Sequence, residues 1–194
     1  MAPLSEHKKT IGFALCGSFC TFRRVIPVIK TLADQYEVLP IMSPVAYETD
    51  TRFGAAADFR REIEEICRKP IIHTIPQAEP IGPKKLLDLL VIAPCTGNTL
   101  AKLAWGISDT AVTLAAKAHR RNLRPVVVAV STNDGLTGNA KSIGTLLNTD
   151  GYFFVPFGQD DPMKKQASLV AQMEQIPETV AAALEGIQIQ PLLQ

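Results

Sequence analysis

The residues of this sequence best suited to chemistry are polar ones that directly follow apolar runs. Thr96, Gly97, Asn98 and Thr99 follow residues 89–93 and Pro94, and apolar residues at helical spacing come next. A turn between a buried strand and a helix N-terminus presents free backbone N–H groups and a favourable dipole to an anion. In an open α/β sheet such a turn lies at the carboxyl edge of the strands, where ligands bind. The pattern therefore predicts a ligand site, although it also occurs as a simple helix cap.

A second turn of this kind joins residues 10–15 to a helix that starts near Thr21. Gly17 and Ser18 stand in it and make a second candidate anion site. The preceding glycine, Gly12, does not complete G-x-G-x-x-G spacing, and the chain contains no Walker motif. The sequence thus lacks the usual dinucleotide and P-loop fingerprints.

Alternating apolar runs and amphipathic segments must position these turns. Strands are expected at residues 10–15, 36–42 (with a bulge at Pro40), 89–93, 125–130 and 152–156, with a short one near 71–73. Helices are expected at residues 21–33, 54–68, from 100 onward, 108–122 (capped by Ser108 or Asp109), 141–147 and 167–184. This order predicts one three-layer α/β/α domain over residues 1–194, Rossmann-like or flavodoxin-like, with about five parallel strands. About eight residues at the N-terminus and six at the C-terminus are expected to be poorly ordered.

Composition narrows the classes of partner. The 194 residues suit a single domain, and a net charge of +1 gives no general attraction to nucleic acid or membrane. No apolar run reaches the length of a membrane span, and the N-terminus lacks the apolar centre of a secretory signal, so we expect a cytoplasmic protein. A basic group is expected to be a solvated face: Lys117, His119, Arg120, Arg121 and Arg124.

The sequence offers no clear metal site. Cys16, Cys20, Cys67 and Cys95 form neither a CxxC pair nor a Cys/His cluster. Buried, reduced thiols are the expected state, with Cys20 and Cys95 the two that could approach the ligand turn in a redox role. The adjacent carboxylates of residues 160–161 are expected to start a loop or helix, and a catalytic role is not expected for His73.

The residue identities at positions 93–109 are more specific than the strand–turn–helix pattern that they form. This stretch resembles the segment A-P-A-[ST]-A-N-T-x-x-K-x-A-x-G-I-A-D of the homo-oligomeric flavin-containing cysteine decarboxylase family of FMN proteins. The matching positions are Ala93, Pro94, Thr96, Asn98, Thr99, Lys102, Ala104, Gly106, Ile107 and Asp109, while Cys95 and Gly97 replace two alanines. The resemblance implies bound FMN and a homo-oligomer. It also implies that Gly17 and Ser18 wrap the phosphate end of FMN and that Ser43 contacts that phosphate, where the residues alone indicate only a Ser-Pro turn.

Two departures from that family remove its decarboxylase groups. The family's proton-handling histidine falls, counting back from Asp88, on Pro80. Of the family's P-x-M-N-x-x-M clamp only Asn133 remains, in the sequence Ser131-Thr132-Asn133-Asp134. The resemblance therefore supports the cofactor more than the decarboxylation.

Three other segments, TDTRFG, VSTNDGL and VPFGQDDPMKKQASLVAQM, resemble one branch of this superfamily, the B-subunit family of dipicolinate synthases, over nearly the whole chain. That resemblance implies oxidation of dihydrodipicolinate during sporulation, together with an A subunit of the nicotinamide-dependent type. A decarboxylase of a cysteine-containing substrate and a non-catalytic partner of the A subunit remain the alternatives.

These resemblances and turns together give the candidate site. Asn98 and Asn133 are expected to face the flavin ring or the substrate. The expected cofactor contacts are Gly17, Ser18, Ser43, Thr96, Gly97, Asn98, Thr99, Ser131 and Thr132. For the two carboxylates of the substrate, the candidate partners are Arg52, Lys84 and Lys85.

Overall fold

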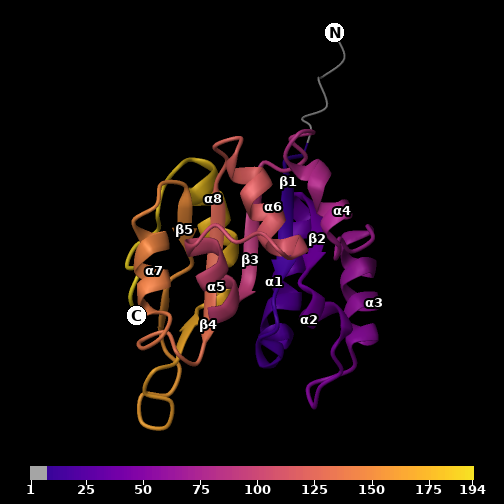
Figure 1. Cartoon of the computed structure of the whole chain (residues 1–194). Helices are drawn as coiled ribbons and strands as arrows, with labels where there is room; N and C mark the ends of the chain where they lie inside the picture. Colours follow the sequence, from indigo (N-terminus) through magenta and orange to yellow (C-terminus); the bar gives the residue numbers. More distant parts are fainter. Residues whose placement is uncertain (1–7) are drawn as a thin grey trace.

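The computed structural model describes residues 8–194, so the prediction for the first seven residues lies outside the described part. Five parallel strands form the body of the sheet in the order β2-β1-β3-β4-β5, which is the flavodoxin-like order (Figure 1). Their bounds are β1 Thr10–Leu15, β2 Glu37–Met42, β3 Leu89–Cys95, β4 Val126–Thr132 and β5 Tyr152–Phe154. Every residue of β3 is buried, as expected for a parallel strand covered on both faces.

Helices cover both faces of this sheet, so the predicted three-layer α/β/α domain is confirmed (Figure 1). On one face lie α5 Gly97–Ala104, α6 Ala111–Arg120 and α7 Ala140–Leu147. On the other lie α1 Phe22–Gln35 and α8 Ile176–Leu184, and α3 Ala56–Cys67 packs against α1 and β2. Shorter helical turns connect these elements: η1 Phe19–Thr21, α2 Pro44–Glu48, α4 Ile75–Ala78, η2 Glu79–Ile81 and η3 Met173–Gln175.

The predicted helix over residues 167–184 is wrong in its first half. A short hairpin, β6 Phe157–Gln159 and β7 Leu169–Ala171, pairs antiparallel and makes the sheet mixed. The end of β4 binds β7, with Ser131 opposite Val170 and Thr132 opposite Leu169. The reason is that Leu169 and Ala171 are buried while Val170 is not, an alternation typical of a strand. Pro177 stands in the first turn of α8, where a missing N–H costs nothing.

Two other local predictions were wrong. The helix α6 is capped by Thr110 rather than Ser108 or Asp109, because Thr110 and Thr113 form a reciprocal capping box. Pro40 makes no bulge: the β1–β2 register runs unbroken through the pair Phe13–Pro40. The strand β2 lies at the sheet's edge, where the proline's missing N–H removes no pairing with β1.

The C-terminal residues run beside the hairpin. Phe157 N donates to Leu192 O (3.0 Å), and Gln194 N donates to Phe157 O (3.2 Å). Gln188 holds the edge of β5 by accepting from Phe154 N and donating to Phe154 O, both at 2.7 Å. These bonds place a segment for which the sequence predicts little order.

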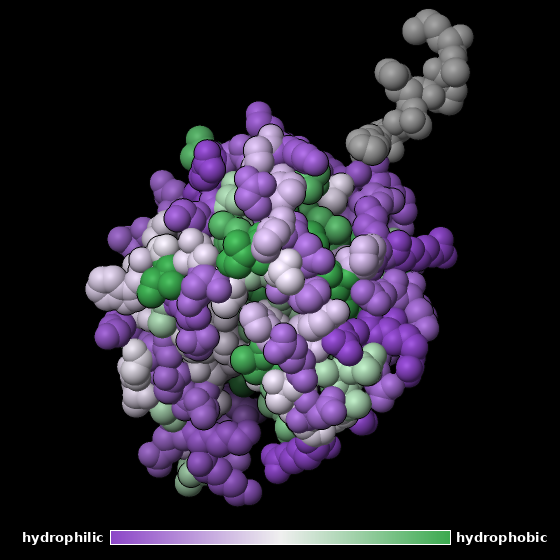
Figure 2. Space-filling model, turned by 45° about the vertical axis from the view of Figure 1, so that its right-hand side comes forward, coloured by the Kyte–Doolittle hydropathy of each residue, from purple (hydrophilic) through white to green (hydrophobic). Residues whose placement is uncertain are grey.

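The molecular surface is mixed. On the face in Figure 2, hydrophobic side chains gather near the middle between hydrophilic margins. Within residues 8–194, no helix is long and apolar enough to cross a membrane.

His119 does not belong to the solvated basic face predicted for its neighbours. It is 1% exposed, and its Nε2 lies 3.0 Å from Pro125 O, which fits a neutral ring that donates this bond. Burial lowers the pKa of His119 to about 4; the carbonyl bond opposes this shift, and the charges of Arg124 and Arg120 add to it.

This burial predicts an acid-dependent loss of stability. Because the unfolded chain takes up the proton near the ordinary pKa of His and the folded chain only near 4, stability falls as the pH drops through that window. The His119 contribution to the loss between about pH 7 and pH 4.5 should be about 2–3 kcal/mol. Urea unfolding of the wild type and of His119→Gln at both pH values measures it. Parallel pH dependences in the two proteins would refute this assignment.

Candidate functional site

A cavity of about 520 Å³ opens at the carboxyl edge of β1, β3 and β4. Its volume is in the range of small-molecule and cofactor sites. The lining comes from five turns or strands that are far apart in the sequence: Gly17, Ser18, Phe19, Cys20, Phe53, Thr96, Gly97, Asn98, Ser131, Thr132, Asn133, Asp134, Asp160, Lys165, Ser168 and Val170. The structure thus joins the turns that the sequence singled out separately.

Three hydroxyl groups lie close together at the turn that follows β1. Ser18 Oγ lies 2.8 Å from Thr21 Oγ1 and 2.8 Å from Ser131 Oγ, and Thr21 Oγ1 lies 3.2 Å from Ser131 Oγ. Thr21 also donates to Ser18 O (2.9 Å). Hydroxyls can both donate and accept, so this cluster can turn its O–H groups toward an anion at the cavity.

The turn before α5 supplies a second polar wall. Thr96 is the N-cap residue in extended conformation, although its side chain makes no capping bond. Thr96, Gly97 and Asn98 line the cavity, whereas Thr99 is 5% exposed and donates to Cys16 Sγ (3.3 Å). The cavity therefore meets the N-terminus of α5 through the first three residues of the turn, and Thr99 faces the core.

Gly97 leaves room for a fixed carboxylate. Asp134 Oδ1 accepts from Thr132 Oγ1 (2.5 Å), and Asp134 Oδ2 accepts from Asn139 Nδ2 (2.7 Å). A Cβ at Gly97 would lie 2.5 Å from Asn139 Nδ2, 2.6 Å from Thr132 Oγ1 and 2.8 Å from Asp134 Oδ1. No methyl group fits there unless this cluster moves, which gives a physical reason why glycine replaces the alanine of the resembling motif.

The hairpin closes the opposite side of the cavity. Ser168 Oγ donates to Thr132 O (3.2 Å), and Val170 pairs with Ser131 in the sheet. The β6–β7 loop brings Asp160 and Lys165 to the lining, and these two side chains form an ion pair. Asp160 and Asp161 thus belong to a loop, as expected, but Asp160 faces the site.

Three of the four cysteines are buried, as expected, and of the two that could approach the ligand turn only Cys20 lines the cavity. Cys16, Cys67 and Cys95 are buried, and burial raises the pKa of Cys16 to about 11 and that of Cys95 well above the ordinary thiol value. Cys20 is exposed, lines the cavity and lies 3.8 Å from Ser18 Oγ. Cys95 faces the core rather than the ligand turn. No group of three potential metal ligands occurs within residues 8–194.

Besides Thr99, four predicted site residues lie away from the cavity. Ser43 caps α2 by accepting from Ala46 N (3.3 Å). The guanidinium carbon of Arg52 lies 4.9 Å from the centre of the Phe53 ring. Phe53 lines the cavity, whereas Arg52 does not. Lys84 and Lys85 precede β3 and therefore lie at the amino edge of the sheet, where Arg124 bonds to Lys85 O (3.2 Å). The structure does not bring these two lysines to the carboxyl edge.

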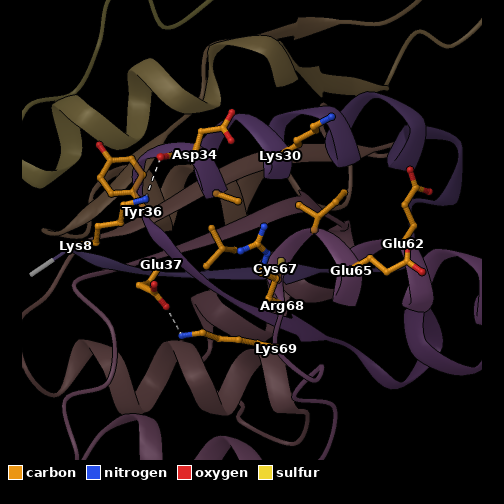
Figure 3. Close-up of a pocket in the computed structure, with 13 residues that line it drawn as sticks. Lys8, Lys30, Asp34, Tyr36, Glu37, Glu62, Glu65, Cys67, Arg68 and Lys69 are labelled. Atoms are coloured by element: carbon orange, nitrogen blue, oxygen red, sulfur yellow. Dashed lines mark hydrogen bonds and ion pairs between the residues drawn. The ribbon is translucent and has the colours of Figure 1, made fainter.

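A larger hollow, about 780 Å³, lies at the amino edge between α1, β2 and α3 (Figure 3). Two of its lysines already have partners: Lys8 Nζ donates to the backbone carbonyl of Asp34 (3.1 Å), and Lys69 forms an ion pair with Glu37 (2.7 Å). Burial raises the pKa of its one thiol, Cys67, to about 12, which makes a poor nucleophile. Volume alone therefore does not mark a functional site here.

Sequence reasoning missed several residues of the site. Thr21, Phe53, Asp134, Lys165 and Ser168 were not among the predicted site residues. Asp134 stands beside Asn133 in a polar segment, so its residue type offered a signal. Lys165 and Ser168 offered none, because the sequence predicts a helix through part of the hairpin.

Comparison with known proteins shows the family of this chain. A family model described as Flavoprotein matches residues 2–185. The chain belongs to the Flavoprotein family. It is 47% identical to the B subunit of dipicolinate synthase from Bacillus subtilis (strain 168) over 186 residues, which are 95% of this chain and 93% of that protein. The resemblance to these B subunits predicted from the sequence is confirmed.

Solved structures of other flavoproteins support the same fold. The crystal structure of the dipicolinate synthase B subunit from Bacillus halodurans C superposes with a TM-score of 0.89 and 44% identity, covering 97% of each chain. The FMN-dependent cysteine decarboxylase SpaF superposes with a TM-score of 0.70 at 21% identity, over 92% of this chain and 97% of that one. The second similarity shows the fold alone.

The residues of the cavity suit a flavin, the cofactor class that the family supports. A flavin mononucleotide needs hydrogen-bond donors for a phosphate and a partly apolar wall for a ring system. The hydroxyl cluster of Ser18, Thr21 and Ser131 supplies the former, and Phe19, Phe53 and Val170 supply the latter.

Gly97→Ala should therefore damage the site. The added methyl group must displace Thr132, Asp134 or Asn139, which should cost about 1–3 kcal/mol of folding free energy. It should also weaken ligand binding at the cavity. The matched control is Gly144→Ala in α7, where a Cβ meets nothing within 4 Å and should stabilise by up to about 1 kcal/mol. Equal melting temperatures of Gly97→Ala and wild type would refute the close-packing argument.

Proposed function

We propose that this protein is the FMN-binding subunit of a dipicolinate synthase and oxidises dihydrodipicolinate to dipicolinate during sporulation. The observation that supports this most is the similarity to named B subunits over almost the whole chain, with a cavity at the carboxyl edge of the sheet. The bulk of the reaction's chemistry would come from the cofactor, and the protein would supply binding and orientation.

The phosphate of FMN would occupy the corner between two polar turns. Ser18, Thr21 and Ser131 would donate from their hydroxyls, and the N-terminus of α5 would add the N–H groups of its first turn. Gly17, Thr96, Gly97 and Thr132 would border the ribityl chain. Ser43 and Thr99, predicted from the resemblance, would act indirectly, by capping α2 and by bonding to Cys16 beneath the site.

Asn98 and Asn133 would face the flavin ring or the substrate. Both line the cavity, Asn98 from the start of α5 and Asn133 from the loop after β4. A flavin held there would supply the acceptor for a hydride from the dihydropyridine ring, which would also release a proton to solvent as it becomes aromatic, and aromatisation makes this oxidation favourable. The two amides can donate and accept hydrogen bonds, and so can hold the substrate ring against the cofactor.

The decarboxylase alternative is not favoured. Pro80, at the position of the family's histidine, lies in η2, which packs against α6 and does not line the cavity. Neither methionine of the family's clamp is present around Asn133, and the structure puts the carboxylate of Asp134 into the lining instead.

The proposal includes two kinds of protein partner. The relatives are named as B subunits, and this name supports the existence of a second, different subunit. We propose that this partner is the nicotinamide-type A subunit of the synthase. Trp105 and Ile107 are 73% and 47% exposed beside a hollow of about 340 Å³, and they support contact with another chain, including a second copy in a homo-oligomer. The location would be the cytoplasm of the mother cell of a spore-forming bacterium.

A flavin titration of the purified protein tests the proposal. FMN should bind with quenching of its fluorescence, and anaerobic dihydrodipicolinate should bleach the visible band of the oxidised flavin, with or without the A subunit. Flavin binding without bleaching in either case would leave a non-catalytic partner and would contradict the proposed oxidation.

A variant pair ties the binding to the hydroxyl cluster. Replacing Ser18 and Ser131 together by alanine should weaken FMN binding about tenfold or more, because the phosphate loses two donors. The matched control is Ser108→Ala, a half-buried hydroxyl between α5 and α6 that does not line the cavity. Equal affinities in both variants would exclude this cluster as the phosphate site.

A further inference from the structure

The charges of the cavity lining are few and unevenly placed. Among its lining residues in the described part of the chain, Lys165 alone is cationic, and Asp134 and Asp160 are anionic. A dicarboxylate entering this cavity would therefore meet two carboxylates and one ammonium group. The position of that ammonium group decides where a carboxylate of the ligand can lie.

Asp134 is fixed and cannot make way for an anion. Both of its oxygens accept hydrogen bonds, from Thr132 and Asn139, and its own carbonyl accepts from Thr137 N and Asn139 N. An anionic group would be repelled from this end of the cavity, next to Gly97, and directed toward the hairpin.

Lys165, in contrast, forms an ion pair that is exposed to solvent. Its partner Asp160 stands in the same loop, and the two side chains are 58% and 38% exposed. An ion pair in contact with water gains little over the separated charges. The hydrogen bond from Lys165 to Asp160 raises the pKa of the lysine, so the side chain stays charged and available.

Asp160 has a second cation nearby. Arg24 at the start of α1 forms a two-point pair with Glu174 (3.0 and 2.8 Å), and the charge of Asp160 adds to the rise in the pKa of Arg24 that this pair mainly causes. If Lys165 turned to a ligand, the carboxylate of Asp160 would still lie in the field of Arg24.

The loop itself is braced independently of that ion pair. Lys165 N donates to Asp161 O (2.7 Å), Ser168 N donates to Lys165 O (2.9 Å), and Gln159 Nε2 donates to Gln166 O (2.9 Å). The backbone of Lys165 can thus keep its place while its ammonium group changes partner.

We propose that Lys165 binds a carboxylate of the small dicarboxylate substrate and exchanges Asp160 for that ligand. This inference rests on the proposed function for the identity of the ligand. It replaces Arg52, Lys84 and Lys85, which the structure leaves outside the cavity lining.

Calorimetric titration with pyridine-2,6-dicarboxylate tests the inference on the flavin-free protein and on the protein with FMN. Lys165→Gln should weaken binding of the diacid about tenfold or more, as the loss of a charge-assisted hydrogen bond predicts. Asp160→Asn should tighten it, because the competing internal anion is gone. The affinity for FMN should be the same in these variants and in the wild type.

The matched control is Lys164→Gln, the same change one residue earlier on a side chain that does not line the cavity. Equal diacid affinity in Lys164→Gln and Lys165→Gln would overturn the inference, as would a wild type that does not bind the diacid in either form. Weaker binding of FMN but not of the diacid in Lys165→Gln would assign this lysine to the flavin phosphate and also overturn it. A wild type that binds the diacid but no FMN would refute the proposed function, while the comparison of the lysine variants would still decide the inference.

Discussion

The candidate site depends on β4 changing its neighbouring strand part-way along its length, from β5 to β7. Its first half pairs in parallel with β5, from Val126 to Val128, and its last two residues pair antiparallel with β7. If β5 continued beside β4 to the end, the carboxyl edge would be an ordinary open edge. Because β5 stops short, the hairpin can bind there and carry Asp160, Lys165, Ser168 and Val170 over the turns that follow β1 and β3. One short piece of antiparallel pairing therefore gives a row of strand ends a further wall and makes an open pocket of them.

The second constraint is close packing at the start of α5. The turn before α5, the loop after β4 and the N-terminus of α7 meet at Gly97, where three polar side chains occupy the space of a methyl group. Thr132 and Asn139 each donate to one oxygen of the Asp134 carboxylate, so both carboxylate oxygens are satisfied, while the buried Asn139 Oδ1 has no hydrogen-bond partner among residues 8–194. The carboxylate thereby fixes the loop after β4, and its charge sets the electrostatic character of that end of the cavity.

The sequence predicted those parts of the fold that follow from local pattern. The parallel strands, the helices that flank them and the turns at Gly17–Ser18 and Thr96–Asn98 follow a regular alternation and are where they were expected. Ser131 and Thr132, expected to follow the strand, instead form its last two residues and pair with β7. The hairpin could not be predicted in this way. Its strands have three residues each, too few for a clear period, and the apolar spacing of Leu169, Met173 and Ile176 also fits a helix. The pairing that decides between the two lies in β4, far away in the sequence.

The cationic residues show a related limit. The sequence offers Lys84 and Lys85 as partners for the carboxylates of an anionic ligand, but charge type gives no information on which edge of the sheet a loop reaches. They precede β3, and a parallel strand places what precedes it at the amino edge. Likewise, His119 was grouped with arginines next to it in the sequence, although the helical period turns it toward the core and its neighbours outward.

The dense motif match in residues 93–109 contains two kinds of residue. Thr96 and Asn98 line the cavity, whereas Lys102 and Asp109 bond to each other at 2.8 and 2.9 Å on the surface between α5 and α6. That hydrogen bond lowers the pKa of Asp109 and ties the end of α5 to the loop that follows. Thr99 supports the turn from beneath through Cys16. A shared motif of this kind argues for a shared scaffold and a shared polar turn, whereas the hairpin and the loop after β4 add Lys165 and Asp134 to the cavity lining from outside the motif.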